Sequence, residues 1–401
     1  MDNFVYSNPV RMLFGEGQIE NLTDEISKYG NKILFVYGQG HIKETGLYDQ
    51  IVKELKQAGI EWVELQGVQP NPRVSLVREG IELCVKEDIE FILGVGGGST
   101  SDTAKAIGMG VKVDYDIWQA YEDFHHLIHQ DDINYHIPED TLPTGIVITK
   151  PGTGSDFDYT SVLSNQETNE KLMVINKTMY PKFSIIEPNF AYSLPQKERV
   201  YGVADIMTHI LEQYFAPIPD IDILDEYKEA NLRVVIDKGK IVKNNPEDYD
   251  AQAHLFYIAS WACSDQSMTG TQGGWDSHMI EHEFSAITDL NHGHGMAIVY
   301  YGWMKYMLQE LEAIPWKFAQ FAKKVWGVEQ KGRSNKEVGL EGIEKTADYW
   351  RELGIDLSLK GVGIGDDVIQ QAAEQAVRFG PIGVLGPLDK QDVLNIFKMV
   401  K

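Results

Sequence analysis

The sequence predicts an α/β domain followed by an all-helical domain. Over the first ~190 residues, short β-rich runs alternate with helical patterns, as in repeated strand–helix–strand units. Pro188 and Pro195 mark a change, because proline interrupts regular structure. Long amphipathic stretches with few strand candidates then continue to the C-terminus. We therefore expect two domains, 1–190 and 191–401, and a chain of 401 residues is long enough for two hydrophobic cores.

The predicted strands of the first domain are short apolar or β-branched runs bounded by turn residues. The run at 91–95, Phe-Ile-Leu-Gly-Val, is apolar throughout and suits a central parallel strand that is buried on both faces. Between the first two runs, Leu47, Ile51 and Leu55 recur every four residues and predict a helix. Strands are expected at 33–37, 61–65, 91–95, 146–148 and 184–186, and helices of the second domain at 196–215, 226–243 and 249–263.

The composition is that of an ordinary globular protein with a strong negative charge. Hydrophobic residues make up 43% of the chain, and the formal net charge is −24. Because nucleic acids and anionic membranes repel an acidic protein, neither is expected as a partner. No apolar run approaches the ~18 residues of a membrane span, and no signal-peptide pattern is present. Cys84 and Cys263 are expected to be buried thiols, and the protein is expected to be cytoplasmic.

Four residues of the second domain have the chemistry and spacing of a divalent-metal site. Asp205 and His209 are four apart in a predicted helix, so both side chains lie on one helical face. His278 and His292 follow, the latter in Asn-His-Gly-His-Gly, where glycines allow close backbone approach. Three imidazoles and a carboxylate suit transition metals better than Ca or Mg. If these segments meet in space, we expect one divalent metal, Fe(II) or Zn, with Ni, Co or Mn as alternatives.

A glycine-rich turn at 94–99, Gly-Val-Gly-Gly-Gly-Ser, follows the predicted central strand and opens a helix. Backbone N–H groups at a helix start bind phosphate, aided by the helix dipole. This context favours the pyrophosphate of a dinucleotide over a plain tight turn, and no Gly-Lys-Ser/Thr ends the turn as in a Walker loop. A second turn at 150–156, Lys-Pro-Gly-Thr-Gly-Ser-Asp, also follows a strand. It is expected either to close over the cofactor or to be a plain turn.

Four motifs occur in a characteristic order along nearly the whole chain. They are Gly-Gly-Gly-Ser-x-x-Asp-x-x-Lys at 96–105, Gly-Thr-Gly-Ser at 152–155, Asp-x-x-x-His at 205–209 and His-x-x-x-His-x9-His at 278–292. This series resembles the iron-containing (group III) alcohol dehydrogenases, and the sequences near both ends resemble their butanol dehydrogenase branch. The resemblance implies a dehydroquinate synthase-like fold, with NAD(P) on the first domain, a dinucleotide-binding domain, and the metal at the domain cleft.

The resemblance also implies a reaction and a role for each matching residue. Hydride would pass between the nicotinamide and a small aldehyde such as butyraldehyde, giving the primary alcohol, while the metal polarises the substrate oxygen. His282, one helical turn from His278, would relay a proton to the alkoxide, with a packing role as the alternative. A homodimer or a larger homo-oligomer is implied. The implied metal ligands are Asp205, His209, His278 and His292, and the implied cofactor contacts are Gly97, Gly98, Ser99, Asp102, Thr149, Ser155 and Lys171.

The segment 37–43 bears on the choice between NAD and NADP. NAD-preferring relatives often carry an aspartate at the position of Gln39, where it accepts a hydrogen bond from the ribose 2′-hydroxyl. This chain has no acid there, and Gln39, His41 and Lys43 are candidate donors to a 2′-phosphate. We therefore expect Gly38, Gln39 and His41 to contact the cofactor, and NADP to be preferred over NAD.

Three other functions and one other site remain open. A cofactor-binding protein without catalysis would keep the glycine turn but has no need of four metal ligands. A relative of glycerol dehydrogenase or dehydroquinate synthase would share the fold, but those enzymes generally use three protein ligands. His278-Met-Ile-Glu281-His282 fits the zinc-hydrolase pattern His-x-x-Glu-His, which leaves the glycine turn unexplained. The stretch 121–136 is rich in Asp, Glu and His; a surface loop is expected there, with a second metal site as the alternative.

Overall fold

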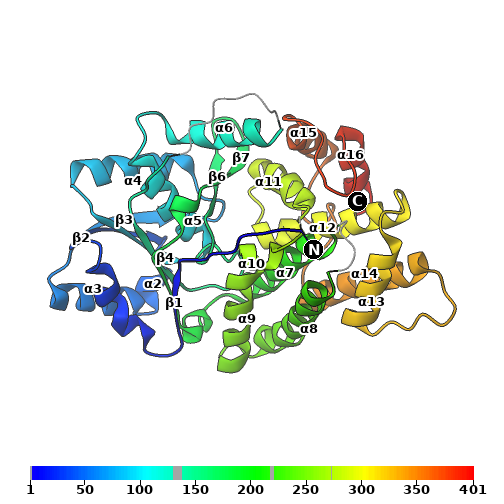
Figure 1. The fold of residues 1–401 in the computed structure, drawn as a ribbon, viewed down its shortest axis with the longest axis horizontal. Coiled ribbons are helices and arrows are strands. Elements are labelled where there is room, and N and C mark those ends of the chain that lie inside the picture. Colours follow the sequence, from blue (N-terminus) through cyan, green and yellow to red (C-terminus); the bar gives the residue numbers. More distant parts are fainter. Residues whose placement is uncertain (1, 130–137, 217–220, 272) are drawn as a thin grey trace. The chain divides into compact units, whose positions relative to one another are not determined.

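The computed structural model of the chain describes residues 2–129, 138–216, 221–271 and 273–401. It forms two compact units (Figure 1): one is Ser7–Leu194, and the other is Pro195–Lys401 together with the residues before Ser7. The first unit holds a parallel sheet flanked by helices, and the second is helical. The predicted fold class is therefore confirmed.

A six-stranded parallel sheet in the order β1-β8-β5-β4-β2-β3 forms the centre of the first unit (Figure 1). All five predicted strands are present, and β4 pairs with both β2 and β5, with residues 91–95 buried as expected of a central strand. The carboxyl end of β4 therefore delivers the glycine turn next to the ends of its two neighbours. The strands are β1 (Arg11–Phe14), β2 (Lys32–Gly38), β3 (Glu61–Val68), β4 (Phe91–Gly96), β5 (Thr144–Ile148) and β8 (Phe183–Ile186).

Helices cover both faces of this sheet. On one face, α3 (Leu47–Ala58) buries Leu47, Ile51 and Leu55 in a core shared with alternate strand residues, Leu93 among them. Gly94 points to the opposite face, because successive strand residues alternate; there it lies against Ala104 of α5 (Gly98–Gly110). The remaining helical elements of this unit are η1 (Gln18–Asn21), α1 (Leu22–Ile26), α2 (His41–Glu44), α4 (Val74–Lys86), α6 (Ile117–His129), η2 (Lys177–Met179) and η3 (Pro188–Ala191).

The expected surface loop at 121–136 is wrong for residues 121–129, which belong to helix α6. Tyr121, Phe124 and His125 are buried and recur at helical spacing, so this helix is amphipathic. The stretch was expected to be a surface loop because its other positions are rich in acidic and histidine residues. His125 accepts a hydrogen bond at Nε2 from the backbone N–H of Met173, and neither group of metal-ligating atoms among the described residues includes His125 or His126. The rest of this stretch, residues 130–136, lies outside the described residues.

Three strands were not predicted. β1 has four residues and pairs only with β8, so it is too short to show an alternating pattern. β6 (Thr160–Asn165) and β7 (Glu170–Ile175) form an antiparallel hairpin outside the main sheet. The four residues that connect them, 166–169, are all polar and form a turn, which is typical of a hairpin.

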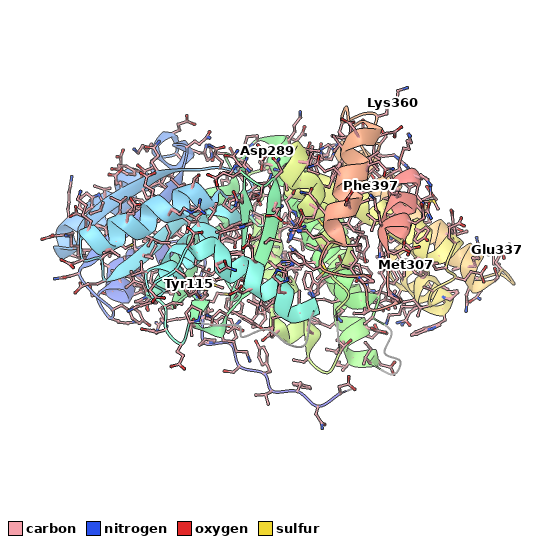
Figure 2. All side chains as sticks on the ribbon, turned by 90° about the horizontal axis from the view of Figure 1, so that it is seen from above. Tyr115, Asp289, Met307, Glu337, Lys360 and Phe397 are labelled. Carbon is pink, nitrogen blue, oxygen red and sulfur yellow. The ribbon has the colours of Figure 1, made fainter. Side chains whose placement is uncertain are left out.

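The second unit is a bundle of helices, and its described residues contain no β-strand. Met307 and Phe397 (Figure 2) belong to its large buried core, and α12 packs against both α7 and α11. None of the described helices in either unit combines the length and the apolar composition that crossing a membrane requires. The helices are α7 (Gln196–Tyr214), α8 (Asp222–Asn244), α9 (Tyr249–Ala262), α10 (Asp265–Met268), α11 (Asp276–Thr288), α12 (His292–Gln309), α13 (Pro315–Trp326), α14 (Asn335–Leu353), α15 (Asp366–Ala376) and α16 (Lys390–Lys398).

Candidate metal centre and cofactor loops

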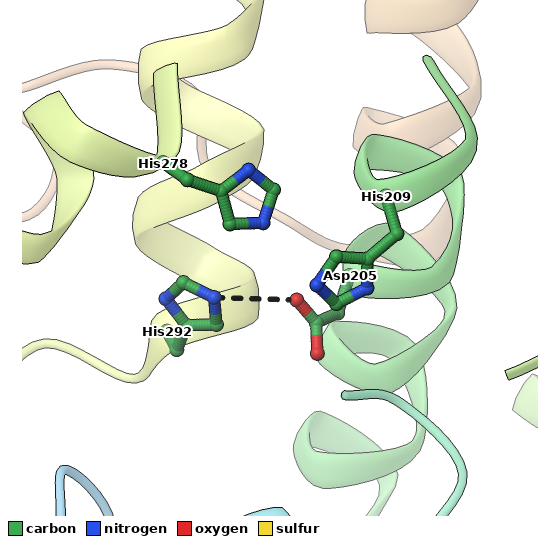
Figure 3. Close-up of side chains that lie close together, drawn as sticks. All are labelled: Asp205, His209, His278 and His292. Atoms are coloured by element: carbon green, nitrogen blue, oxygen red, sulfur yellow. Dashed lines mark ion pairs between the residues drawn. The ribbon is translucent and has the colours of Figure 1, made fainter. Parts of the chain in front are cut away.

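The four residues predicted to bind metal come together from three helices (Figure 3). Asp205 and His209 lie one turn apart on α7, His278 lies in the first turn of α11, and His292 is the first residue of α12. One donor atom from each lies within 4.8 Å of the other three. Four atoms bonded tetrahedrally to one ion at about 2.1 Å lie about 3.4 Å apart, so inward shifts of up to about 1 Å would let all four share an ion. The segments therefore meet in space, as the prediction required.

The surroundings of Asp205 fit a cation. Its side chain is buried, and within the described residues its Oδ1 accepts no hydrogen bond; His292 Nε2 is 3.5 Å away. Leaving a buried carboxylate oxygen without a partner is costly unless a cation binds it. Three imidazole nitrogens and one oxygen form the donor set of Fe(II) or Zn rather than of Ca or Mg.

Two buried glutamates contact the Nδ1 atoms of two of these imidazoles. Glu212 of α7 lies 3.0 Å from His278 Nδ1 and also accepts hydrogen bonds from the His278 backbone N–H (3.1 Å) and the Ser277 hydroxyl. Glu281 of α11 contacts His292 Nδ1. Glu212 was not among the site residues predicted from the sequence, although its place three residues after His209 puts it on the same helical face.

The candidate metal centre concentrates acidic side chains away from water. Asp205, Glu212, Asp276 and Glu281 are each at most 4% exposed. Burial raises the pKa of Glu212; burial also raises that of Asp276, and repulsion from Glu212 adds to the effect. A bound divalent cation would offset this charge, because buried carboxylates are tolerated only when a positive group compensates them.

His282 is buried on α11 one turn beyond His278, outside the set of four. Its ring centroid lies 5.6 Å from that of His292 and 6.3 Å from that of His278. His278 and His282 do not share a group of ligating atoms within the described residues, and the Glu281 carboxylate is buried against His292. The zinc-hydrolase hypothesis requires both histidines on one ion and an available glutamate, so this geometry does not favour it.

In the first unit, the two turns predicted to bind the cofactor lie against each other. Gly98 opens α5, and a Cβ at this position would clash with the side chain of Thr153, so only glycine allows this close approach. The backbone N–H of Thr149 donates to the carbonyl of Gly96 (2.8 Å). The predicted contacts Gly97, Gly98, Ser99, Asp102, Thr149 and Ser155 thus belong to one pair of adjoining turns.

Lys105 ties these turns together. Its side chain is fully buried and its Nζ donates to the Ser155 carbonyl (2.8 Å) and to Asp158 Oδ1 (2.7 Å). Ser155 Oγ in turn donates to Asp102 Oδ1 (2.5 Å). Burial raises the pKa of Asp102 to about 6, against the opposing effect of Lys105. The sequence placed Lys105 in the glycine motif without a role, and the structure gives it a structural one.

The other predicted cofactor residues also lie in the first unit, outside these two turns; Gly38 is at the carboxyl end of β2, next to the glycine turn that follows β4. Gly38 ends β2, Gln39 is exposed beyond it, and His41 begins α2 with its Nε2 3.0 Å from Ser193 Oγ. Lys171 is buried on β7 and donates to Asn71 Oδ1 (3.0 Å). The contacts of these residues with a cofactor stay predictions.

Known proteins match the chain from end to end. Residues 9–188 match the family of iron-containing alcohol dehydrogenases, and residues 199–400 match the C-terminal part of the same family. NADH-dependent butanol dehydrogenase A of Clostridium acetobutylicum is 40% identical over 400 residues, with 99% of each chain covered. The NADPH-dependent aldehyde reductase of Escherichia coli K12 is 29% identical over 364 residues, covering 91% of this chain and 90% of that one.

A solved structure supports the same assignment. The crystal structure of NADH-dependent butanol dehydrogenase A from Thermotoga maritima has a TM-score of 0.92 and 38% identity, covering 100% of this chain and 99% of that one. These relatives do not favour the glycerol dehydrogenase, dehydroquinate synthase or hydrolase hypotheses. The chain therefore belongs to the iron-containing alcohol dehydrogenase family, as its sequence motifs predicted, and is an NAD(P)-dependent oxidoreductase that interconverts alcohols and aldehydes.

Proposed function

We propose that this enzyme reduces a small aliphatic aldehyde such as butyraldehyde to the primary alcohol, and catalyses the reverse reaction, with one Fe(II) or Zn ion held by Asp205, His209, His278 and His292. The meeting of these four side chains is the observation that carries the proposal. The butanol dehydrogenase relatives support the substrate class.

When bound, the ion supplies a Lewis acid for the substrate oxygen and NAD(P)H supplies the hydride. The chain's own residues hold and enclose that site. Asp205 and His209 are fixed one turn apart on α7, and the burial of Asp205, His209 and His278 limits access of competing water. The ring of Trp275 packs edge-on against His278, 5.0 Å between centroids, and limits the space beside the ligands. His282 is the buried imidazole beside the set that is suited to move a proton to the product oxygen.

His282→Ala is expected to retain bound metal and to lower kcat by about 10²-fold, the lower end of the usual effect of a general acid. The loss should be largest at high pH, where other proton donors are scarce. The pH dependence of kcat and elemental analysis of the purified variant measure the two parts. A kcat equal to that of the wild type would make His282 a packing residue.

For the cofactor, we propose NADH rather than the NADP that Gln39, His41 and Lys43 predicted. Lys43 is engaged with acidic and polar neighbours: its Nζ is 3.9 Å from Glu64 and donates to Gln66 (3.3 Å). Although burial opposes it, hydrogen bonds from Tyr37 and Tyr48 lower the pKa of Glu64, so this carboxylate stays ionised. A negative charge at this edge disfavours a 2′-phosphate. The NADH-dependent relatives support the same preference.

Glu64→Gln is expected to raise kcat/KM for NADPH more than for NADH, because it removes the charge that engages Lys43. Glu61→Gln, an exposed position on the same strand, is the matched control and should leave the ratio unchanged. The ratio of the two kcat/KM values measures the effect. A ratio that does not move in Glu64→Gln would show that the 2′-group is recognised elsewhere.

The proposed function is tested by mixing the purified, metal-loaded enzyme with butyraldehyde and either NADH or NADPH and following the nicotinamide absorbance. We expect metal-dependent oxidation, with kcat/KM at least about tenfold higher for NADH, a difference of about 1.4 kcal/mol. A metal-loaded enzyme that oxidises neither cofactor with any short-chain aldehyde would overturn the proposal.

A further inference from the structure

The two glutamates behind the metal ligands connect three helices in sequence. Glu212 on α7 holds His278 on α11, and Glu281 on α11 holds His292 on α12. In both cases the carboxylate contacts Nδ1, so Nε2 is the ring nitrogen left for other partners. For His292, Nε2 is the atom 3.5 Å from Asp205 Oδ1, on the side where the four donor atoms converge.

The start of α12 is shaped to admit the Glu281 carboxylate. A Cβ on Gly295 would lie 2.5 Å from Glu281 Oε1. A Cβ on Gly293 would clash with the backbone carbonyl of Tyr201 on α7. At both positions glycine is required because neighbouring atoms leave no room for a Cβ, and not because the backbone has a positive φ. The His-Gly-His-Gly sequence at 292–295 brings the first turn of α12 against α7 on one side and against a buried carboxylate on the other.

A carboxylate at Nδ1 has a defined effect on a histidine that binds metal. It accepts the Nδ1–H, which fixes the tautomer and places the lone pair on Nε2. It also fixes the ring orientation and makes Nε2 a stronger donor. This matters most for His292, because one of its ring nitrogens also falls within 4.8 Å of ligating atoms of Glu281 and His282, which form an alternative group.

We propose that Glu212 and Glu281 are positioning residues that set the metal affinity of the centre by holding His278 and His292 through Nδ1. The proposal rests on the proposed function, since it takes the four-residue set as the metal site. In this arrangement Glu281 does not bind the metal. It directs His292 towards Asp205 and away from the alternative group with His282.

The test compares metal affinity in apo-proteins titrated with Co(II), read from the visible absorption of the bound ion and from competition with a chelator. Glu281→Gln keeps the shape of the side chain and removes its charge. Glu283→Gln is the matched control, because Glu283 is also buried on α11 and its carboxylate accepts a hydrogen bond from Arg378. Thermal unfolding of both apo-variants separates a loss of folding from a loss of affinity.

We expect Glu281→Gln and Glu212→Gln to raise the Kd for Co(II) by about 10- to 100-fold, as is usual when the partner of a ligating histidine is changed. The Kd of Glu283→Gln should equal that of the wild type. Gly295→Ala should act in the same direction as Glu281→Gln, because the added methyl group displaces a carboxylate that is still present.

Three outcomes would count against the proposal, and they differ. Wild-type affinity in both glutamine variants, with the wild type itself binding Co(II), would overturn the positioning role alone. Failure of the folded wild type to bind Co(II) would overturn the metal centre, and this proposal with it. A weakened Glu283→Gln equal to Glu281→Gln would assign the effect to general loss of charge on α11 and also overturn the specific role.

Discussion

His278→Ala is expected to lose the bound metal and to lower kcat/KM by at least about 10³-fold. His278 is nearly fully buried among the four converging donor atoms, so its loss leaves three ligands and an unfilled position. A Lewis acid contributes several kcal/mol of charge stabilisation, and each 1.36 kcal/mol corresponds to about a tenfold change in rate. Metal content and initial rates are measured on the same preparation.

The matched control for this variant is His254→Ala. His254 is an exposed histidine on α9 whose Nδ1 lies 2.6 Å from the carbonyl oxygen of Asp250 in the preceding turn. It should keep both the metal and the activity of the wild type. An active His278→Ala without metal would contradict the assignment of the site.

Lys105→Met is expected to destabilise the first unit by about 3–5 kcal/mol, the usual cost of removing one partner of a buried ion pair. The methionine fills a similar volume but leaves Asp158 and the Ser155 carbonyl buried without their donor. Because the same contacts join the two cofactor turns, the KM for NADH should rise as well. Urea unfolding followed by circular dichroism measures the stability.

Two further variants control for the burial of the lysine and for the carboxylate that loses its partner. Lys112→Met removes a lysine just beyond the same helix that is 38% exposed and 3.5 Å from Asp140; an exposed pair of this kind contributes at most about 1 kcal/mol. Lys105→Met combined with Asp158→Asn should recover part of the lost stability, because the uncompensated carboxylate is gone. Equal stability of Lys105→Met and the wild type would contradict a structural role for Lys105.

The sequence predicted those parts of the fold that depend on local pattern. The run 91–95 was predicted to be a central strand because every residue in it is apolar, and the pairing of β4 on both sides confirms this. Helix α6 was not predicted because Glu122, Asp123 and the histidines around them are typical of an exposed loop. Which of its residues are buried depends on packing against other elements, which no local pattern shows. β1 was missed because an edge strand of four residues carries too little pattern.

The candidate ligands of the metal centre could be predicted from the sequence, but the residues that hold ligands and turns in place could not. Asp205 and His209 are recognisable from helical spacing and His278 and His292 from residue chemistry, and the structure brings all four together. The roles of Glu212 and Lys105 depend on contacts that span 66 and 53 residues of sequence, to His278 and Asp158 respectively. Such pairings follow from the packing of whole helices and turns, which sequence spacing does not determine.

Graded addition of Fe(II) or Zn to the metal-free enzyme, with bound metal and butyraldehyde reduction measured at each step, shows whether one bound ion supports the reaction. We expect activity to rise in proportion to bound metal and to stop rising at one ion per chain. Full activity in the metal-free enzyme, or one tightly bound ion per chain that restores no activity, would contradict this expectation.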